Sequence, residues 1–585
     1  MQKAAVLGAT VMLAVSYLSA PAASQVPSST VAADVIYRNG KIFKGLEEGF
    51  TDAVAVRDGT IIAVGSDELL LSHRGEATRL IDLEGHTMLP GFFDNHIHLG
   101  SDGPPLMEWK AGLIAAVPEW IRAASEITSL QDALREEAAE TPQGEWILGA
   151  LSREVWPNQS LPTRWDLDEG AFDHPVLLTR GPHTTILNSR ALALAGIDRS
   201  THSTGGGEIG RDAAGEPDGR LYDAARRLVA EVAPARAATV VDQRQAIENM
   251  RRSLLQHASG GVTSVNIASV RPGDLRTIQA LYERHGAELP RATVQLRLRP
   301  GYDAYDDLDL AVRESIRELE SIGFVTGFGD DRLRLGAIKM SIDGGLSAPA
   351  FWSLEPYENR PEFQGVVRIP ATAFYPVARR AHELGWQLGI HAIGDGAAEM
   401  VVTQLERILT ELPRQDHRHY LHHVSVKPPQ TTIDTMARLG IGVASQPSFT
   451  VGLGAFAVEA LGGDREVTMN PTRSLLDAGV WVSWGSDGAP YGPRVSLWTG
   501  ITRKGWDDRV YGPAEAVTRS EAVHLHTWAP AYQTFSEDVK GTIEVGKLAD
   551  FVVLGEDVFT IDVDRIRHVP ILRTIVGGRE IHARP

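Results

Sequence analysis

Six side chains of the kinds that bind metal ions or carry protons stand at or near the ends of short apolar segments of this chain. They are His96, His98, Lys339, His391, His423 and Asp487. Imidazole and carboxylate groups are ligands of zinc-type ions. The chain contains no cysteine, which excludes thiolate sites and disulfides. A metal site must therefore use His, Asp, Glu, a backbone oxygen or a modified side chain.

The spacing of His96 and His98 matters because residues i and i+2 of a strand point to the same side. Both imidazoles then face one direction, and together they can hold an ion. A single His-x-His pair more often reflects chance or surface hydrogen bonding than a metal site. The recurrence of such residues at five strand ends favours one shared site.

The segments that contain these residues are predicted to be buried strands. They span residues 91–99, 261–269, 293–300, 334–342, 386–394, 418–426, 441–447 and 480–487. Amphipathic stretches such as ATAFYPVARRAHELG separate the later ones. Alternation of strands and helices predicts a parallel sheet, and eight strands predict an α/β fold of the (β/α)₈ TIM barrel type. Polar residues at the carboxyl ends of such strands meet at the barrel mouth.

The remaining segments suggest three further parts. Residues of about 101–252 do not fit the repeat, and we interpret them as a large insertion in a barrel domain of residues 91–535. Residues 30–90 and 536–585 are rich in short Val- and Ile-containing runs, which predicts one composite β-sandwich domain from both ends of the chain. The Asn39-Gly40 and Asp58-Gly59 pairs are typical of β-hairpin turns.

The first residues follow a targeting pattern. Lys3 precedes an apolar stretch from Ala4 to Leu18, and small residues follow it. This predicts a signal peptide over residues 1–24 and an exported protein, periplasmic or secreted. An uncleaved N-terminal anchor is the alternative, although the run is short for a membrane span. We expect no membrane span after cleavage.

The charge balance of the sequence indicates which class of binding partner to expect. The 585 residues include 75 acidic and 57 basic side chains, which gives a formal net charge of −18. A nucleic-acid partner would require a basic patch, and the sequence shows no long basic run. We therefore expect a small-molecule substrate and no nucleic acid.

Several longer motifs resemble those of the amidohydrolase superfamily, in particular its amidohydrolase-3 branch, which includes N-substituted formamide deformylase. They cover most of the chain: GFFDNHIHLG (91–100), LTRGPHTTILNSRALALAGI (178–197), GEPDGRLYDAA (215–225), HAIGDGA (391–397), DHRHYLHHVSV (416–426), WGSDGAPYGP (484–493) and GTIEVGKLADFVVL (541–554).

The resemblance implies a metal-binding barrel with a composite β-sandwich domain. It implies that His96, His98, His391, His423 and Asp487 bind one or two divalent ions, with zinc the leading candidate. Lys339 would carry a carboxyl group on Nζ and bridge two ions. The alternative is an ordinary Lys339 ammonium group paired with Asp343, beside a single ion.

One position departs from the family pattern. The sixth-strand motif usually reads Glu-His, and here it reads His422-His423. Neighbours on a strand face opposite sides, so we expect only one of the two rings to point at the metal, with His423 as the ligand.

The implied chemistry is hydrolysis of a carbon–nitrogen bond other than a peptide bond, in an amide, formamide or cyclic amide. A metal-activated hydroxide would attack, and Asp487 would take and later return a proton. His183 would bind the oxyanion or the substrate, or else be an ordinary loop residue. Tyr222 and Trp352 are weaker candidates for the pocket wall, and Asp395 for orienting the turn after His391. A deaminase or lactonase on the same scaffold, or a non-catalytic binding protein, are the alternatives.

Overall fold

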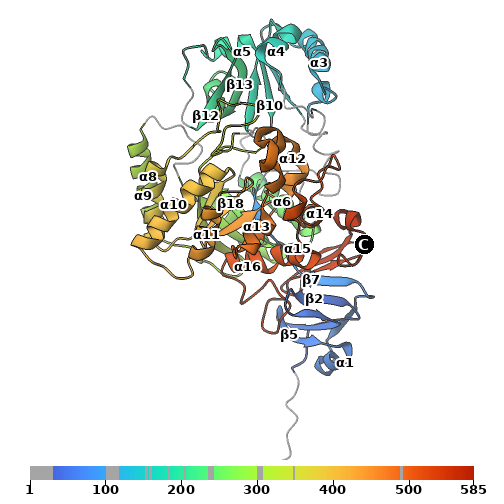
Figure 1. The fold of residues 1–585 in the computed structure, drawn as a ribbon. Helices are drawn as coiled ribbons and strands as arrows, with labels where there is room; N and C mark the ends of the chain where they lie inside the picture. The colour runs from blue at the N-terminus through green and yellow to red at the C-terminus, as the bar shows by residue number, and fades with distance from the viewer. Residues whose placement is uncertain are drawn as a thin grey trace, which may run out of the picture.

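The computed structural model describes residues 31–99, 117–151, 156, 161–181, 183–202, 206–234, 243–298, 307–346, 350–487 and 492–584. The signal-peptide segment lies outside these residues and stays a prediction. Three parts follow one another along the long axis of the molecule (Figure 1): a β-sandwich at one end, the barrel in the middle and a separate lobe at the other end. Among the described residues, no helix is both long and apolar enough to cross a membrane.

The central part is an eight-stranded, all-parallel sheet that curls into a nearly closed barrel. Its strands are β8 (Phe92–Ile97), β14 (Val262–Val270), β15 (Arg291–Arg297), β16 (Leu333–Ser341), β17 (Leu388–Ala392), β18 (Tyr420–His423), β19 (Gly442–Ser445) and β20 (Val482–Trp484). All eight overlap the segments that the sequence predicts as barrel strands, and β14, β15 and β16 each extend one or two residues beyond the predicted bounds. The predicted fold class is confirmed.

Helices cover the outside of the barrel, because each crossover between parallel strands must return along the outer face. They are α6 (Gln243–Ser259), α7 (Leu275–His285), α8 (Leu308–Ser321), α9 (Ala371–Glu383), α10 (Asp395–Glu411), α11 (Gln430–Leu439), α13 (Thr472–Asp477), α14 (Pro493–Thr502), α15 (Arg519–Leu525) and α16 (Trp528–Gln533). α12 (Ser448–Leu461) lies at the mouth instead, where the Phe449 ring stacks 5.6 Å from the His423 ring. Apolar faces of these helices and strands form one continuous core.

The barrel closes where the end of β20 meets β8. The Asp487 N–H donates to the His96 carbonyl over 2.7 Å, and the Ser486 N–H donates to Asp94 Oδ1 over 2.8 Å. A Cβ atom at Gly485 would lie 2.4 Å from the His96 nitrogen, which is too close for any other residue type. Closure therefore depends on a glycine directly before two polar residues.

Strands from both ends of the chain form the β-sandwich. One sheet contains β1 (Val35–Arg38), β4 (Ala53–Arg57), β5 (Thr60–Gly65) and β6 (Arg79–Asp82), beside the short α1 (Asp67–Leu70). The other contains β2 (Lys41–Gly45), β3 (Gly49–Thr51), β7 (Thr87–Pro90), β21 (Phe551–Leu554), β22 (Ile571–Val576) and β23 (Arg579–Ala583). Apolar residues of the two sheets share a core.

Only one of the two expected hairpins forms. β4 and β5 pair antiparallel across Asp58-Gly59, as predicted. Across Asn39-Gly40 the strands do not pair, because β1 joins β4 and β6 while β2 joins β3 and β7. The Asn39 turn thus carries the chain from one sheet to the other, and the hairpin prediction at this turn is wrong.

The third lobe lies between β8 and β14 in sequence. Its sheet has the order β12 (Gly207–Arg211), β13 (Pro217–Asp223), β11 (Thr184–Leu187), β10 (Val176–Arg180) and β9 (Ile147–Ala150), with α3 (Ile127–Glu140), α4 (Arg164–Ala171) and α5 (Ser189–Leu194). It has its own apolar clusters. The boundary expected at about residue 252 falls inside α6, whose Ile247 and Leu254 belong to the barrel core. The insertion therefore ends before Gln243.

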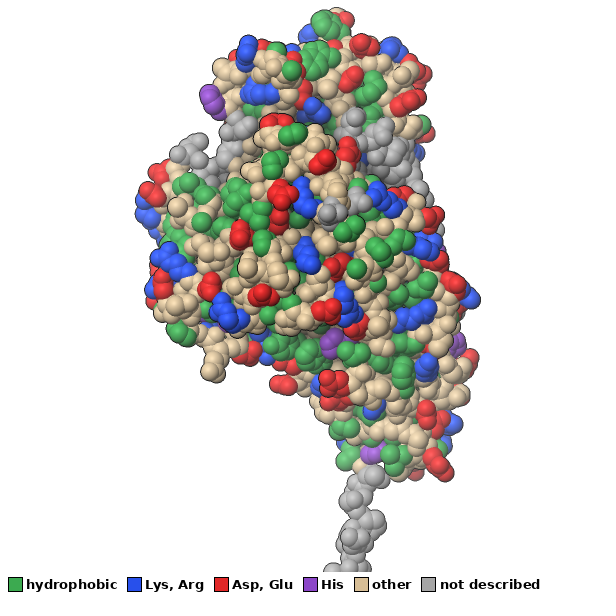
Figure 2. Space-filling view, in the orientation of Figure 1, with side chains coloured by type: hydrophobic (Ala, Val, Ile, Leu, Met, Phe, Trp, Pro, Cys, Tyr) green, Lys and Arg blue, Asp and Glu red, His purple; other side chains and the backbone are tan. Residues whose placement is uncertain are grey.

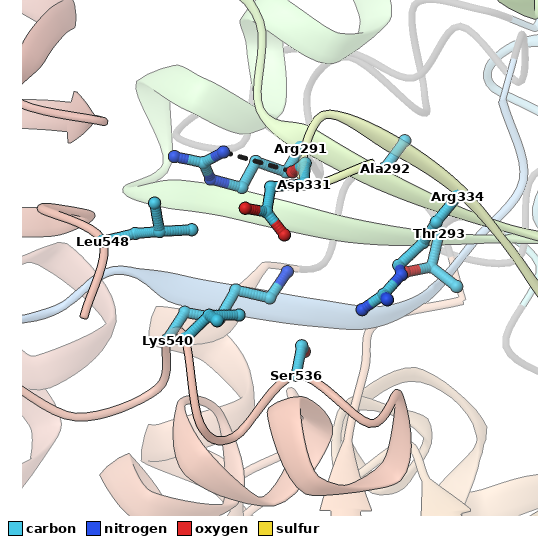
Figure 3. A pocket seen from close by; sticks show the side chains of 9 residues that line it. Arg291, Ala292, Thr293, Asp331, Arg334, Ser536, Lys540 and Leu548 are labelled. Carbon is cyan, nitrogen blue, oxygen red and sulfur yellow. Dashed lines mark hydrogen bonds between the residues drawn. The ribbon is translucent and has the colours of Figure 1, made fainter. Parts of the chain in front are cut away.

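Buried charges join the barrel floor to the β-sandwich. Arg291 Nε lies 2.7 Å from Asp550 Oδ2, and Arg291 Nη1 donates to the Asp331 carbonyl (Figure 3). Lys540 Nζ donates to Ser264 Oγ over 3.0 Å. Arg291 opens β15 and Asp550 precedes β21, so this contact attaches the sandwich to the end of the barrel that lies away from the mouth.

The outer surface mixes charges of both signs. Figure 2 shows acidic and basic side chains interspersed over one face of the molecule, with apolar side chains between them. This face carries no broad basic patch of the kind that binds nucleic acid.

Candidate active site

The barrel brings the candidate ligands together at one end, because the carboxyl ends of parallel strands share an edge. His96 lies in β8, Lys339 in β16, His391 in β17 and His423 in β18. Asp487 follows β20 by three residues. The side chains of Lys339 and the three histidines are buried.

Asp487 stands at the centre of the group. Its Oδ1 atom lies 3.2 Å from His96 Nε2 and 3.1 Å from His98 Nε2. The His98 ring is 39% exposed while the His96 ring is fully buried, so His98 marks the side of the site that faces solvent. Asp487 adopts a φ of +63°, a left-handed conformation that is unfavourable for residues other than glycine. Strain of this kind clusters at functional sites.

His391 and His423 form the opposite wall. Their ring centroids are 4.5 Å apart, and the His423 ring lies 5.1 Å from that of His96. His96, His423 and Asp487 each offer a ligand atom within 4.8 Å of the other two. This trio is a candidate metal centre.

Lys339 contacts one member of this trio, His96. Its Nζ atom is 2.8 Å from His96 Nε2, and only 1% of the residue is exposed. The alternative pairing of Lys339 with Asp343 does not form, because the two side chains contact different groups. Asp343 instead accepts hydrogen bonds from the backbone of Ile393 and Gly394, and its Oδ1 lies 3.4 Å from His391 Nε2.

Both histidines of the sixth strand lie near His96, but only His423 belongs to the trio of ligand atoms within 4.8 Å. The His422 ring centroid is 4.3 Å from that of His96, closer than the 5.1 Å of His423. The alternation of sides ends here because His423 has a φ of +76° and Val424 a φ of +49°. Strict alternation of sides therefore does not hold at these two residues, while the choice of His423 as the ligand stays a prediction.

Burial controls the protonation of the cluster. It lowers the pKa values of His96, His391, His422 and His423 well below the ordinary range, and nearby cationic groups lower them further. Burial also lowers the pKa of Lys339 to about 7. Burial would raise the pKa of Asp487, but the hydrogen bond and charge of His98 outweigh it and lower the pKa overall. The group is thus a set of neutral imidazoles around one carboxylate.

Two glutamines, which the sequence does not single out, orient the imidazoles. Gln446 Oε1 lies 2.6 Å from His423 Nδ1, and Gln295 Oε1 lies 2.9 Å from His422 Nε2. An amide oxygen only accepts hydrogen bonds, so it fixes the proton on the facing ring nitrogen. In His423 this leaves Nε2 as the lone-pair atom, which is the form that binds a metal.

The insertion contributes the remaining candidates. His183 lies between β10 and β11, and its Nδ1 atom is 2.8 Å from Asp223 Oδ1. Tyr222 is the neighbour of Asp223 in β13. In the barrel, the Trp352 ring lies over Gly396, and Asp395 Oδ1 accepts from the Leu354 and Gly396 N–H groups. These last contacts fit the expectation that Asp395 orients the turn after β17.

The donor set fits a divalent ion. His391 Nε2 is buried without a hydrogen-bond partner, and the lone pairs of neutral imidazoles converge with the Asp487 carboxylate. Neutral imidazole and carboxylate are both ligands of zinc in proteins. A buried, unsatisfied polar atom is costly unless something binds it.

The fold and site define a hydrolase of the amidohydrolase type. The chain belongs to the amidohydrolase family, whose model matches residues 79–582. It is 28% identical over 534 residues to N-substituted formamide deformylase of Arthrobacter pascens, covering 90% of this chain and 94% of that enzyme. It is 29% identical over 557 residues to YtcJ of Bacillus subtilis, whose name assigns it to the amidohydrolases, covering 94% and 99%.

Solved structures show the same fold. The chain resembles the crystal structure of an uncharacterized metal-dependent hydrolase from Pyrococcus horikoshii with a TM-score of 0.62 and 22% identity. The match covers 91% of this chain and 99% of that one.

Proposed function

We propose that this protein is a metal-dependent hydrolase that cleaves the carbon–nitrogen bond of a small amide, formamide or cyclic amide. The observation that carries the proposal is the convergence of His96, His423 and Asp487 within 4.8 Å at the barrel mouth. The similarity to N-substituted formamide deformylase supports the choice of a non-peptide amide.

The proposed ligands are His96, His98, His391, His423 and Asp487. A bound divalent ion lowers the pKa of water and polarises a carbonyl oxygen. We further propose that Lys339 carries a carbamate. An ammonium group 2.8 Å from a ligand nitrogen would repel a cation, whereas a carbamate presents two oxygens to it.

Asp487 is proposed to move the proton. Its Oδ1 atom lies within 3.2 Å of two imidazole nitrogens and its side chain is 22% exposed, so the carboxylate reaches both the buried ligands and the open side of the site. A carboxylate in this position takes a proton from the attacking water and returns it to the leaving nitrogen. His183 is proposed to contact the substrate from the insertion.

The test combines metal content with a substrate screen. Purified protein is stripped with a chelator, reloaded with zinc, manganese or iron, and offered N-alkylformamides, acetamides, cyclic amides, lactones and aminopyrimidines. We expect hydrolysis of at least one amide class by the reloaded protein, and none by the stripped protein. Equal turnover with and without metal contradicts the mechanism, and turnover of lactones or aminopyrimidines alone contradicts the substrate class.

A further inference from the structure

His183 reaches the barrel from the inserted lobe. A Cβ atom added at Gly345, which follows β16, would lie 2.8 Å from His183 Cδ2 and 3.0 Å from His183 Nε2. The Nε2 side of the ring is therefore the side that touches the barrel mouth. Gly345 lies two residues after Asp343, whose Oδ1 atom is 3.4 Å from His391 Nε2. His183 thus lies beside the segment that contacts the candidate metal centre.

The contact with Asp223 fixes the position of the His183 proton. Asp223 is buried, with a side chain only 3% exposed. Burial opposes its charged form, but Arg368 and His183 outweigh burial and lower the pKa of Asp223. The group is therefore a carboxylate, which can only accept, so His183 Nδ1 carries the hydrogen and donates it over 2.8 Å.

The charge of Asp223 is already balanced within the structure. Arg368 Nη2 contacts the same Oδ1 atom, and the Arg368 side chain is only 2% exposed. The neutral form of an imidazole has a single N–H group. In that form, with the hydrogen on Nδ1, the ring would present the lone pair of Nε2 to the mouth.

Backbone contacts hold this arrangement from both sides. The Asp223 N–H donates to the His183 carbonyl over 2.9 Å, and Asp223, the last residue of β13, adopts a φ of +48°. The Arg368 N–H donates to the Ile342 carbonyl of the barrel over 2.7 Å. The imidazole is thus fixed by the insertion and by the barrel together.

We propose that His183 determines substrate specificity by accepting a hydrogen bond from the N–H group of the scissile bond. The favoured substrates are then secondary amides, including N-monosubstituted formamides. Esters and N,N-disubstituted amides lack this hydrogen and leave the Nε2 lone pair without a partner. A site built around one hydrogen bond discriminates strongly against analogues that cannot make it. The inference rests on the proposed function and refines its substrate class.

The first test compares three substrates with one acyl group: an N-alkylformamide, its N-methyl derivative and the matching formate ester. The metal-loaded wild type and His183→Phe are measured on each. We expect the variant to lose about tenfold or more in kcat/KM on the secondary amide, the usual scale for losing a buried hydrogen bond. We expect less than about a threefold loss on the ester and the N-methyl amide, where no such bond exists.

A milder variant displaces the ring without removing it. Gly345→Ala places a methyl group against the His183 ring. We expect the same selective loss of kcat/KM on the secondary amide, with a smaller magnitude. Gly323→Ala is the matched control, since a Cβ atom there meets no other atom within 4 Å. We expect this control to leave all three rates unchanged.

The tautomer itself is tested by ¹⁵N NMR of histidine-labelled protein, with the His183 signals assigned by their loss in His183→Phe. We expect a protonated Nδ1 and an unprotonated Nε2. A proton on Nε2, or an equal loss by His183→Phe on all three substrates, overturns the specificity role. If the metal-loaded wild type hydrolyses none of the three while hydrolysing other compounds, the proposed substrate class fails, and this inference fails with it.

Discussion

The carbamate proposed at Lys339 can be tested through the pH at which the stripped enzyme recovers. Carbon dioxide reacts with a neutral amine and not with an ammonium group. Lys339 is buried against His96, and burial lowers its pKa to about 7. The neutral form is favoured above the pKa, so reactivation with metal and carbon dioxide should speed up as the pH rises and then level off.

The expected size follows from that pKa. With a pKa of about 7, the neutral fraction is about one tenth at pH 6, one half at pH 7 and nine tenths at pH 8. An ordinary lysine with a pKa of about 10.4 would be about 0.4% neutral at pH 8. The buried amine should therefore react about 200-fold more readily at pH 8 than an exposed lysine of equal intrinsic reactivity.

The assay follows recovery of activity and the ¹³C signal of a labelled carbamate, at a fixed partial pressure of carbon dioxide. Recovery should rise about tenfold in total between pH 6 and pH 8 and little beyond. Lys339→Ala should bind less metal and lose activity, and a small carboxylic acid should partly restore both. A rate that climbs tenfold per unit up to pH 10, or a Lys339→Ala protein with full metal and full rate, would refute the reasoning.

Three further outcomes are expected. Asp487→Asn keeps the shape of the side chain but removes the base, and kcat should fall about 10²-fold or more in steady-state assays; a near-normal rate would assign the proton to another group. His391→Asn should lower bound metal by elemental analysis, while the exposed His202→Asn should not; equal loss in both would exclude a specific role. Burial lowers the pKa of His417 to about 4. Because the unfolded chain then takes up the proton first, stability should fall as the pH drops from about 6.5 to 4, by up to about 3 kcal/mol. His417→Gln should show a shallower fall in urea midpoints, and an unchanged slope would contradict the assignment.

The barrel strands could be predicted from sequence because each is a short apolar run that is buried on both faces. Such runs carry their own signal, independent of the partner strand. The sandwich is different. Asn39-Gly40 and Asp58-Gly59 carry the same local turn signal, yet only the second joins paired strands. Which sheet a strand joins is decided by distant partners such as β7 and β21, and no local pattern reports that.

In the candidate site, too, local sequence patterns predicted some features and missed those that depend on distant residues. The residue types at strand ends predicted which side chains approach the mouth. The pattern of alternation failed at His422 and His423, because the positive φ of His423 departs from strand geometry and both rings lie near that of His96. Arg368 and Gln446 were not predicted at all, since neither belongs to a spacing pattern and each acts through contacts with residues distant in sequence.

Closure of the barrel and placement of the ligands depend on the same contacts. Ser486 donates from its backbone and side chain to Asp94, 392 positions earlier, and the next residue, Asp487, donates to the His96 carbonyl. Gly485 permits this approach because a Cβ atom would collide with the His96 backbone. The first and last strands therefore cannot separate without also separating His96 from Asp487. The geometry of the candidate metal centre is thus set by completion of the barrel, and a folded but open barrel would hold the right residues in the wrong places.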